Sequence, residues 1–552
     1  MKTLQKYLIC GAVALFGLTS CVQDLDVVPQ DENKILEFNQ NAVFSKCYAT
    51  LAMTGQQGPA GSGDVEDIDE GMSSFYRMTW IFQEMPTDEC WIPWNDPGFD
   101  DLRKVRWNSL NQQIQGVYYR LYFDITMCNH FLENAKADGD GAYQIAEVRF
   151  IRAFNYFYLL DMFGSVPFVD KVSPGKKPQY TRQQLYDWLE AELLDIEKTL
   201  PETRINDFRV DKYTAKLLLA RLYLNAEVYT GTAQWQKAAD YAKEVIDSPH
   251  KLHTAASGAY SAYQELFMGD NYRVIGGPTG EALLLIYQDG IYCQTYGGST
   301  FLVLACRNTD YLSANSSDGW AGYRSTPEFL SKFVDLDETA SILANEFDMP
   351  ALLGDDRAIL CSVLTNDKPV VKADSTQAPE EYYKPRGSMG SFNESWSMIK
   401  WTGRYVENEL GDDITVPGHQ STFVDTDIPM LRVGEAYLTY AEAVHRGATA
   451  NGLSAKEAVQ ALRDRANNTE DFTISDEFLL DEWSREFWAE GRRRMDLVRF
   501  GKFAGPNADY HWEGRGGNKS SEGLLVLDKK FNIYPLPEAD IVAAGLEQAE
   551  GY

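Results

Sequence analysis

Two neighbouring amphipathic segments, at 211–229 and 234–247, constrain the fold more than any other feature of the sequence. In the first, apolar side chains recur at steps of three and four, which predicts one face of a helix. The recurring residues are Tyr213, Leu217, Ala220, Leu224 and Val228. We expect Asp211 to cap the start of this helix and Gly231 to end it. The second segment has alanine at several equivalent positions, so the two helices can pack closely, as tetratricopeptide-type pairs do.

A second helix pair is predicted much later in the chain, at 430–446 and 454–467. The pattern Ser454-x-x-Glu457 is a capping box for its second member. Further helices are predicted near 113–135, 143–163, 182–199 and 476–499. Because no strict 34-residue period links them, we predict a mainly α fold. It is a degenerate tetratricopeptide-like helical-repeat scaffold with long loop-rich insertions and a few short strands.

The first twenty residues have the layout of a secretory signal peptide. Lysines precede an apolar run that is too short to span a membrane. The run ends in Leu18-Thr19-Ser20-Cys21, which resembles a bacterial lipobox, so Cys21 is the expected lipidation site. The alternative is ordinary cleavage beside an incidental cysteine. The polar residues that follow, at 21–40, are expected to form a tether to the lipid anchor.

The remaining residues, 41–552, are expected to form a single domain with two kinds of region. The helical scaffold is predicted at about 113–250 and 430–500. Residues 52–112 and 251–428 are rich in Gly, Asn, Asp and Ser, and their aromatic residues show no periodicity. Loops of this length are uncommon unless they bind something. We therefore expect the binding site there, on the rigid helical support.

The net charge and the cysteines restrict the kind of ligand. The formal charge of -30 repels phosphate backbones and favours a neutral ligand over nucleic acid. Beyond the leader and Cys21, the sequence has no CxxC pair and no histidines at zinc spacing. The remaining cysteines are expected to be mostly buried free thiols; they are Cys47, Cys90, Cys128, Cys293, Cys306 and Cys361.

Several stretches along the whole chain resemble the SusD/RagB family of outer-membrane nutrient-binding lipoproteins. They are the lipobox followed by VQDLDVVP, RFIRAFNYFYLLDMFGSVPF at 149–168, DTDIPMLRVGEAYLTYAEA at 425–443, REFWAEGRRRMDLVRFGKF at 485–503 and YPLP at 534–537. Pieces of the loops also resemble the starch-binding founder of the family. They are DEGMSSFYR at 69–77, MPTDEC at 85–90, NAEVYTG at 225–231, YQELFM at 263–268, YGGSTFLV at 296–303 and DGW at 318–320.

This resemblance implies a non-catalytic lipoprotein on the outer surface of a Bacteroidetes-type outer membrane. Such a protein would bind starch or malto-oligosaccharides and pass them to a SusC-like TonB-dependent transporter. A different neutral glycan is the alternative ligand. No cofactor is implied.

The resemblance also implies a set of binding residues. Trp94, Tyr296 and Trp320 would form a curved aromatic platform, because aromatic rings cover the C–H faces of pyranose sugars. Asp69, Arg77 and Asn95 would bond the sugar hydroxyls. From the residues alone other roles stay open at three of these positions, and a structural role is open for the neighbouring Trp91. Trp94 is a candidate core residue, Arg77 a partner for an acid, Asp96 a replacement for Asn95, and Trp91 a buried prop for the loop.

Two further hypotheses concern acidic residues. A glycoside hydrolase needs two carboxylates flanking the scissile bond, and Glu486 and Glu490 fall one helical turn apart. Several arginines lie beside them, which favours an internal ion-pair network; these are Arg485, Arg492, Arg493 and Arg494. A structural Ca²⁺ is a weaker hypothesis. It rests on two pairs of turn acids, Asp425 with Asp427 and Asp270 with Asp289.

Overall fold

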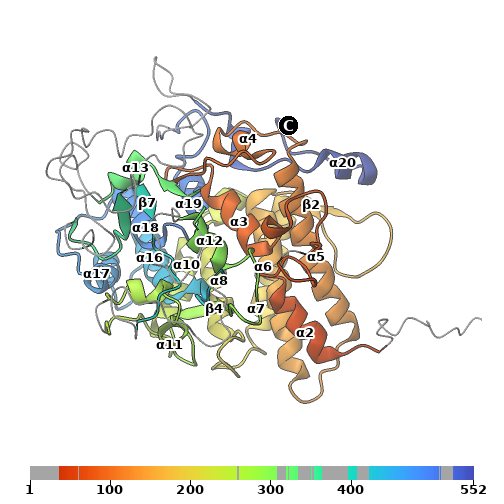
Figure 1. Cartoon of the computed structure of the whole chain (residues 1–552), viewed down its shortest axis with the longest axis horizontal. Coiled ribbons are helices and arrows are strands. Elements are labelled where there is room, and N and C mark those ends of the chain that lie inside the picture. The colour runs from red at the N-terminus through yellow and green to blue at the C-terminus, as the bar shows by residue number, and fades with distance from the viewer. Residues whose placement is uncertain are drawn as a thin grey trace, which may run out of the picture.

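The computed structural model shows a helical scaffold that carries long loop regions (Figure 1). The residues that the structure describes are 37–59, 61–257, 260–306, 319–320, 322–333, 350, 353–362, 396–406, 422–508, 510, 512 and 526–552. The predicted leader, Cys21 and most of the predicted tether therefore lie outside the described residues. Among the helices that are described, none combines the length and the apolar character that crossing a membrane requires.

Seven helices form the scaffold, and each packs against the next (Figure 1). In order of contact they are α5 (Gln112–Asn134), α6 (Gly141–Met162), α7 (Arg182–Ile196), α8 (Lys212–Leu224), α10 (Trp235–Asp247), α16 (Val433–His445) and α17 (Ala455–Arg465). At one end, α2 (Gln40–Ala49) packs on α5 and α6. The neighbours α10 and α16 are far apart in the sequence, so the predicted repeat scaffold is confirmed but is interrupted by one long insertion.

The first predicted helix pair forms with the expected caps. The Asp211 carboxylate accepts hydrogen bonds from the backbone N–H groups of Tyr213 (3.0 Å) and Thr214 (3.2 Å). Gly231, with φ of 74°, ends the segment. The structure differs at Asn225, where the predicted single helix divides into α8 and a short α9 (Ala226–Thr230). The three alanines of α10 that face its neighbours are buried; they are Ala238, Ala239 and Ala242.

The second pair is confirmed only in part. Ser454 and Glu457 form the predicted capping box of α17. The first three residues predicted as helix, 430–432, belong instead to strand β8 (Ile428–Arg432), and the helix begins at Val433. Strand β8 pairs antiparallel with the wholly apolar strand β4 (Ala282–Ile286). This pairing buries an apolar segment that is too distant in sequence for a local pattern to reveal.

The helix predicted at 476–499 is also divided. It forms α18 (Asp476–Phe487) and α19 (Arg493–Arg499), joined by a break in which Ala489 has φ of 58°. Side chains from distant segments bond the backbone of the break. The indole N–H groups of Trp80 and Trp401 both donate to the Ala489 carbonyl, at 3.0 and 2.9 Å. These partners stabilise a left-handed residue that sequence periodicity cannot predict.

Glu486 and Glu490 belong to a buried ion-pair network, as predicted. Arg432 donates to Glu486 (2.7 Å) and to Glu490 (2.8 Å), and Arg465 and Arg357 also contact Glu486. The arginines adjacent in sequence bind other acids. Arg485 pairs with Glu482, Arg492 with Asp496, Arg493 with Asp88 and Arg494 with Asp161. Both carboxylates are therefore occupied by cations inside the protein.

The other elements are short. One sheet has the strand order β1 (Cys90–Trp91), β5 (Arg324–Ser325), β7 (Trp396–Met398), β6 (Leu360–Ser362), and β2 (Val166–Pro167) pairs with β3 (Gln179–Tyr180). The remaining helices are η1 (Glu70–Met72), α3 (Phe75–Glu84), α4 (Phe99–Arg103), η2 (Gln264–Phe267), α11 (Tyr272–Ile275), α12 (Ser299–Ala305), α13 (Pro327–Leu330), η5 (Lys529–Asn532) and α20 (Glu538–Ala544).

The cysteines behave as predicted where they are described. Cys47, Cys90, Cys128 and Cys306 are buried free thiols, and Cys293 is a half-buried one. Burial raises the pKa of Cys90 and of Cys128, so both remain protonated. The side chain of Cys361 lies outside the described residues.

We predict that Glu486→Gln lowers the free energy of unfolding by about 3–5 kcal/mol, because three buried arginines lose their shared carboxylate. Urea unfolding of the purified protein measures this change. The control is Lys456→Ala, which breaks the exposed pair with Asp471 and should cost no more than about 1 kcal/mol. Equal losses in the two variants would contradict the role assigned to the network.

A second prediction concerns Glu84, whose carboxylate accepts from the N–H groups of Gly491 and Arg492 at the helix break. Burial, followed by the neighbouring Glu89, raises the pKa of Glu84 well above 4.5. Its contribution to stability is therefore present below the ordinary pKa and is lost as pH rises through the folded-state pKa.

Glu84→Gln removes this titration. We expect its urea midpoint to exceed that of the wild type by an amount that grows as pH rises from about 4 to 8. Glu477→Gln, at an exposed position, serves as the control. A difference between Glu84→Gln and wild type that does not vary with pH would count against this account.

Candidate functional site

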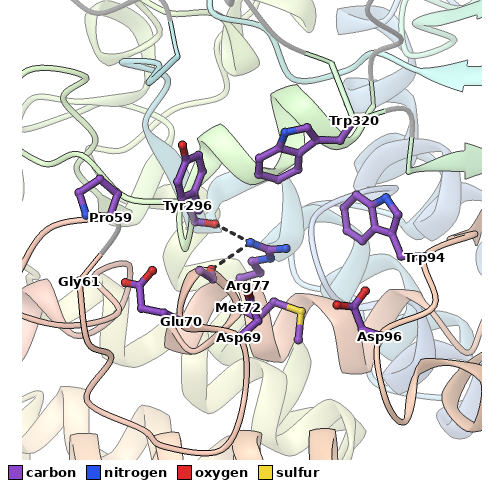
Figure 2. Close-up of a pocket in the computed structure, with 11 residues that line it drawn as sticks. Pro59, Gly61, Asp69, Glu70, Met72, Arg77, Trp94, Asp96, Tyr296 and Trp320 are labelled. Atoms are coloured by element: carbon purple, nitrogen blue, oxygen red, sulfur yellow. Dashed lines mark hydrogen bonds between the residues drawn. The ribbon is translucent and has the colours of Figure 1, made fainter.

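A pocket of about 660 Å³ opens where four separate segments meet (Figure 2). Its lining residues are Pro59, Gly61, Asp69, Glu70, Gly71, Met72, Arg77, Trp94, Asp96, Tyr296 and Trp320. They come from the segment that runs from the loop before η1 to the start of α3, from the loop after β1, from the loop before α12, and from Trp320 after it. The pocket thus brings together five of the six binding residues that the sequence suggested: Asp69, Arg77, Trp94, Tyr296 and Trp320.

Three aromatic rings form a bent row along the pocket, which we call the first ring row: Tyr296, Trp320 and Trp94. The centroids of Tyr296 and Trp320 are 5.6 Å apart with the ring planes at 47°. Those of Trp320 and Trp94 are 6.0 Å apart with the planes at 65°. All three side chains are half-buried and line the pocket, so neither tryptophan is a core residue.

The position of Trp94 is fixed by its backbone and by a glycine opposite. The Arg103 guanidinium donates to the carbonyls of Ile92 (2.6 Å) and Trp94 (3.1 Å), which holds this proline-containing loop against α4. A Cβ atom at Gly322 would lie only 2.2 Å from the Trp94 indole, so the ring rests on bare backbone. Trp91 is half-buried in β1, opposite Arg324, and does not line the pocket.

Tyr296 and Trp320 are held beside the ends of α12. Before this helix, the hydroxyl of Ser74 donates to the Gly297 carbonyl (2.7 Å). A Cβ at Gly297 would lie 2.4 Å from the Ala52 carbonyl oxygen, so this close approach requires glycine. After the helix, the Trp320 backbone N–H donates to Leu304 (2.7 Å). Short backbone contacts therefore position both rings.

Arg77 lies beneath the first ring row and has no ion-pair partner among the described residues. Its Nη1 donates to the carbonyls of Gly71 (3.0 Å) and Tyr296 (3.2 Å), as the dashed lines in Figure 2 show. The guanidinium lies 4.4 Å from the Phe301 ring centroid and 5.7 Å from that of Trp320. Burial lowers the pKa of Arg77 to about 10, so it remains a cation at neutral pH. From this position the Arg77 guanidinium can donate a hydrogen bond to a ligand in the pocket.

Acidic side chains surround the mouth of the pocket. Asp69 is exposed at the start of η1, with Glu70 beside it, and Asp96 faces them from the loop after β1 (Figure 2). Desolvation is the main reason that the pKa of Glu70 is raised. Each of these carboxylates offers acceptors to ligand hydroxyl groups.

The structure places Asn95 outside the lining of the pocket, and its contact with a sugar hydroxyl stays a prediction. Asn95 is exposed and does not line the pocket, whereas Asp96 does. The chain turns at this point, because the Phe99 N–H bonds the Asp96 carbonyl (3.0 Å), and neighbouring side chains therefore point in different directions. Sequence reasoning also missed Glu70, which is adjacent to Asp69, and the aromatic supports Phe301 and Phe423, which touch Trp94 and Tyr296 respectively.

The acids considered for Ca²⁺ accept hydrogen bonds from the protein. Asp425 accepts from the Gly290 N–H (2.7 Å), Asp427 from the Gln288 N–H (2.6 Å) and Asp270 from the Val406 N–H (3.1 Å). Within the described ranges, no group of three or more His, Cys, Asp or Glu side chains is arranged to hold a metal ion. These acids bridge loops, and burial raises the pKa of Asp427 well above its usual range.

Comparisons with known proteins agree with this architecture. Residues 295–552 match the model of the SusD family, and residues 64–224 match a model described as "Starch-binding associating with outer membrane". The starch-binding protein SusD of Bacteroides thetaiotaomicron is 36% identical over 98% of this chain and 97% of its own length.

Solved structures share the fold. A SusD superfamily protein from Parabacteroides distasonis aligns with a TM-score of 0.64 at 18% identity, over 93% of this chain and 98% of its own. Surface glycan-binding protein A from Bacteroides thetaiotaomicron, in complex with laminarihexaose, aligns with a TM-score of 0.63 at 19% identity, over 92% and 98%.

The helical scaffold and the open pocket lined by aromatic rings define a class of binding proteins. Within that class, the chain belongs to the SusD family.

We predict that Gly322→Ala displaces the Trp94 indole, since the added methyl group would occupy the space of the ring. Quenching of tryptophan fluorescence by acrylamide should increase. In a Trp94→Phe background the same substitution should change the quenching less. An unchanged quenching constant in the otherwise wild-type protein would show that the indole does not depend on Gly322.

Proposed function

We propose that this protein captures starch and malto-oligosaccharides at the cell surface, with the first ring row as the platform for the glucose rings. The observation that carries the proposal is the bent arrangement of three half-buried rings, with successive planes turned by 47° and 65°. Successive glucoses of an α-1,4-glucan are rotated, so the chain coils. A bent row follows such a coil better than a flat surface does.

Polar groups of the pocket would complete the recognition. Pyranose rings place C–H groups on their faces and hydroxyls at their rims, so stacking needs donors and acceptors at the ring edges. Asp69 and Asp96 would accept from hydroxyls, and Arg77 would donate to them. The SusD relative supports starch as the ligand. A different neutral glycan could make the same stacking contacts and hydrogen bonds. It remains the alternative ligand, because a protein of similar fold has been solved in complex with laminarihexaose.

The expected affinity is modest. Each ring would cover some 40 Å² of sugar, which contributes about 1 kcal/mol at roughly 25 cal/mol/Å². Three rings together with a few exchanged hydrogen bonds, less the cost of ordering the glycan, leave about 4–6 kcal/mol, equivalent to a Kd between roughly 1 mM and tens of μM. Weak contacts repeated along a polymer suit a surface receptor that must later release its ligand.

The same proposal includes attachment and hand-off. Lipidation at Cys21 would anchor the protein in the outer membrane, and residues 21–40 would act as the tether. The bound glucan would pass to a SusC-like TonB-dependent transporter, with the helical scaffold as the contact surface. The matched model that is described as associating with the outer membrane supports this location.

We predict that maltoheptaose quenches the tryptophan fluorescence of the mature protein and that Trp320→Ala abolishes this effect, because the central ring of the row is lost. Trp91→Phe is the matched control, since Trp91 is half-buried nearby but outside the pocket. Affinity gels with amylopectin, pullulan, dextran and inulin would then identify the preferred glycan.

Three outcomes would contradict the proposal. Retardation by dextran or inulin but not by amylopectin would replace starch with another neutral glycan. Release of reducing ends from amylose would require a hydrolase. Quenching that survives Trp320→Ala would move the glycan away from the first ring row.

A further inference from the structure

Exposed aromatic side chains adjoin Phe208, outside the first ring row. Tyr272 and Tyr287 are each 42% exposed, and Tyr292 is 85% exposed. Ile205, also exposed, precedes Phe208 by three residues. Contiguous exposed apolar surface on a soluble protein usually marks a binding site.

Within this region three rings form a second row, which we call the second ring row: Tyr272, Phe208 and Tyr287. The centroids of Tyr272 and Phe208 are 5.8 Å apart with the planes at 34°, and those of Phe208 and Tyr287 are 4.5 Å apart with the planes at 52°. As in the first ring row, neighbouring rings are in contact and their planes are tilted. A cavity of about 320 Å³ lies beside the second row and is lined by Phe208 and Tyr287.

Both exposed rings of the second row have a carboxylate at the rim. The Tyr272 hydroxyl donates to Asp207, and the Tyr287 hydroxyl donates to Asp289 at 3.1 Å. Each carboxylate retains acceptor capacity for the hydroxyl groups of a ligand. The first site has a similar combination, because Trp94 and the carboxylate of Asp96 line the same pocket.

The central ring is held in place before any ligand arrives. The Asn206 side chain accepts from the N–H groups of Phe208 and Arg209, both at 3.1 Å. The Arg209 side chain in turn is bound to the buried Glu147 at 2.9 Å. A platform that is already ordered loses little conformational entropy on binding.

We propose that the second ring row is an additional binding platform for neutral glycans. A protein partner would have to bury the rim carboxylates Asp207 and Asp289 and would need compensating cations, at a considerable desolvation cost. Sugar hydroxyls donate to carboxylates without carrying charge, and a chain with a net charge of -30 does not repel them. The choice of an α-glucan as the probe rests on the proposed function; the platform itself rests on the geometry of the second row.

The cavity beside the second row lies near the first row. Cys293 lines the cavity of the second row, Tyr296 belongs to the first row, and three residues of chain span at most about 11 Å. The Thr295 hydroxyl donates to the Ala52 carbonyl (3.2 Å), which ties this connection to another residue that lines the cavity. A second platform that binds the same glucan molecule would raise the avidity for polymers, while each single contact stays weak.

The test uses the mature full-length protein in amylopectin affinity gels, with maltoheptaose exchange measurements beside them. The variants are Tyr272→Ala/Tyr287→Ala, Trp320→Ala and the combination of all three, with Tyr143→Ala, an exposed tyrosine elsewhere, as the control. We expect the double variant to bind amylopectin roughly tenfold more weakly, because the second ring row is lost. Trp320→Ala should retain a residual retardation that the triple variant lacks, and Tyr143→Ala should match the wild type.

Hydrogen exchange in the wild type gives a readout that does not depend on the variants folding. Maltoheptaose should protect backbone amides near 205–208, 272–275 and 287–293. If Trp320→Ala alone abolishes retardation, while the double variant and the exchange at these segments are unchanged, the second platform is refuted and the first stands. If the wild type binds no glucan in the gels or in the exchange measurements, the proposed function is refuted. The second ring row is then also refuted as a binding site for α-glucans.

Discussion

The break between α18 and α19 is the point on which the arrangement of the site depends. Its backbone is bonded by Trp80 and Glu84 of α3 and by Trp401 and Lys400 of the insertion, all far away in the sequence. Arg432 joins β8 to the carboxylates that flank the break. Buried charges contribute little net stability when they are paired, but they are costly when they are mismatched. The network therefore specifies one arrangement of these segments more than it strengthens the fold.

Helix α3 transmits this constraint to the pocket. Its C-terminal half is bound to the break, and its first turn carries Arg77 and the Ser74 hydroxyl that holds the loop of Tyr296. The pocket is thus assembled on a helix whose far end is hydrogen-bonded to the break in the core. This explains how rings from loops can keep the spacings that a stiff, repetitive ligand requires.

The parts of this structure that sequence could predict are those decided by near neighbours. The helices α5, α8, α10 and α17 follow local apolar periodicity. Asp211 caps α8 and Ser454 caps α17, as expected. The strand at 428–432 and the break at 488–492 could not be predicted, because they depend on β4, Trp80 and Trp401, which lie far away in the sequence. In the site, family resemblance identified the three rings of the first row. Whether Asn95 or Asp96 faces the pocket was undecidable, since it depends on the turn that Arg103 and Phe99 stabilise.

The neighbours α10 and α16 are separated by the long insertion, and the β4–β8 pair lies beside the point where the chain returns to the scaffold. The helices therefore form an uninterrupted frame whether the inserted chain is long or short. Natural variation can lengthen, shorten or rewrite the inserted loops without disturbing the helix contacts on either side. Such an architecture allows one helical frame to carry different inserted loops, which here supply Tyr296 and Trp320 to the pocket.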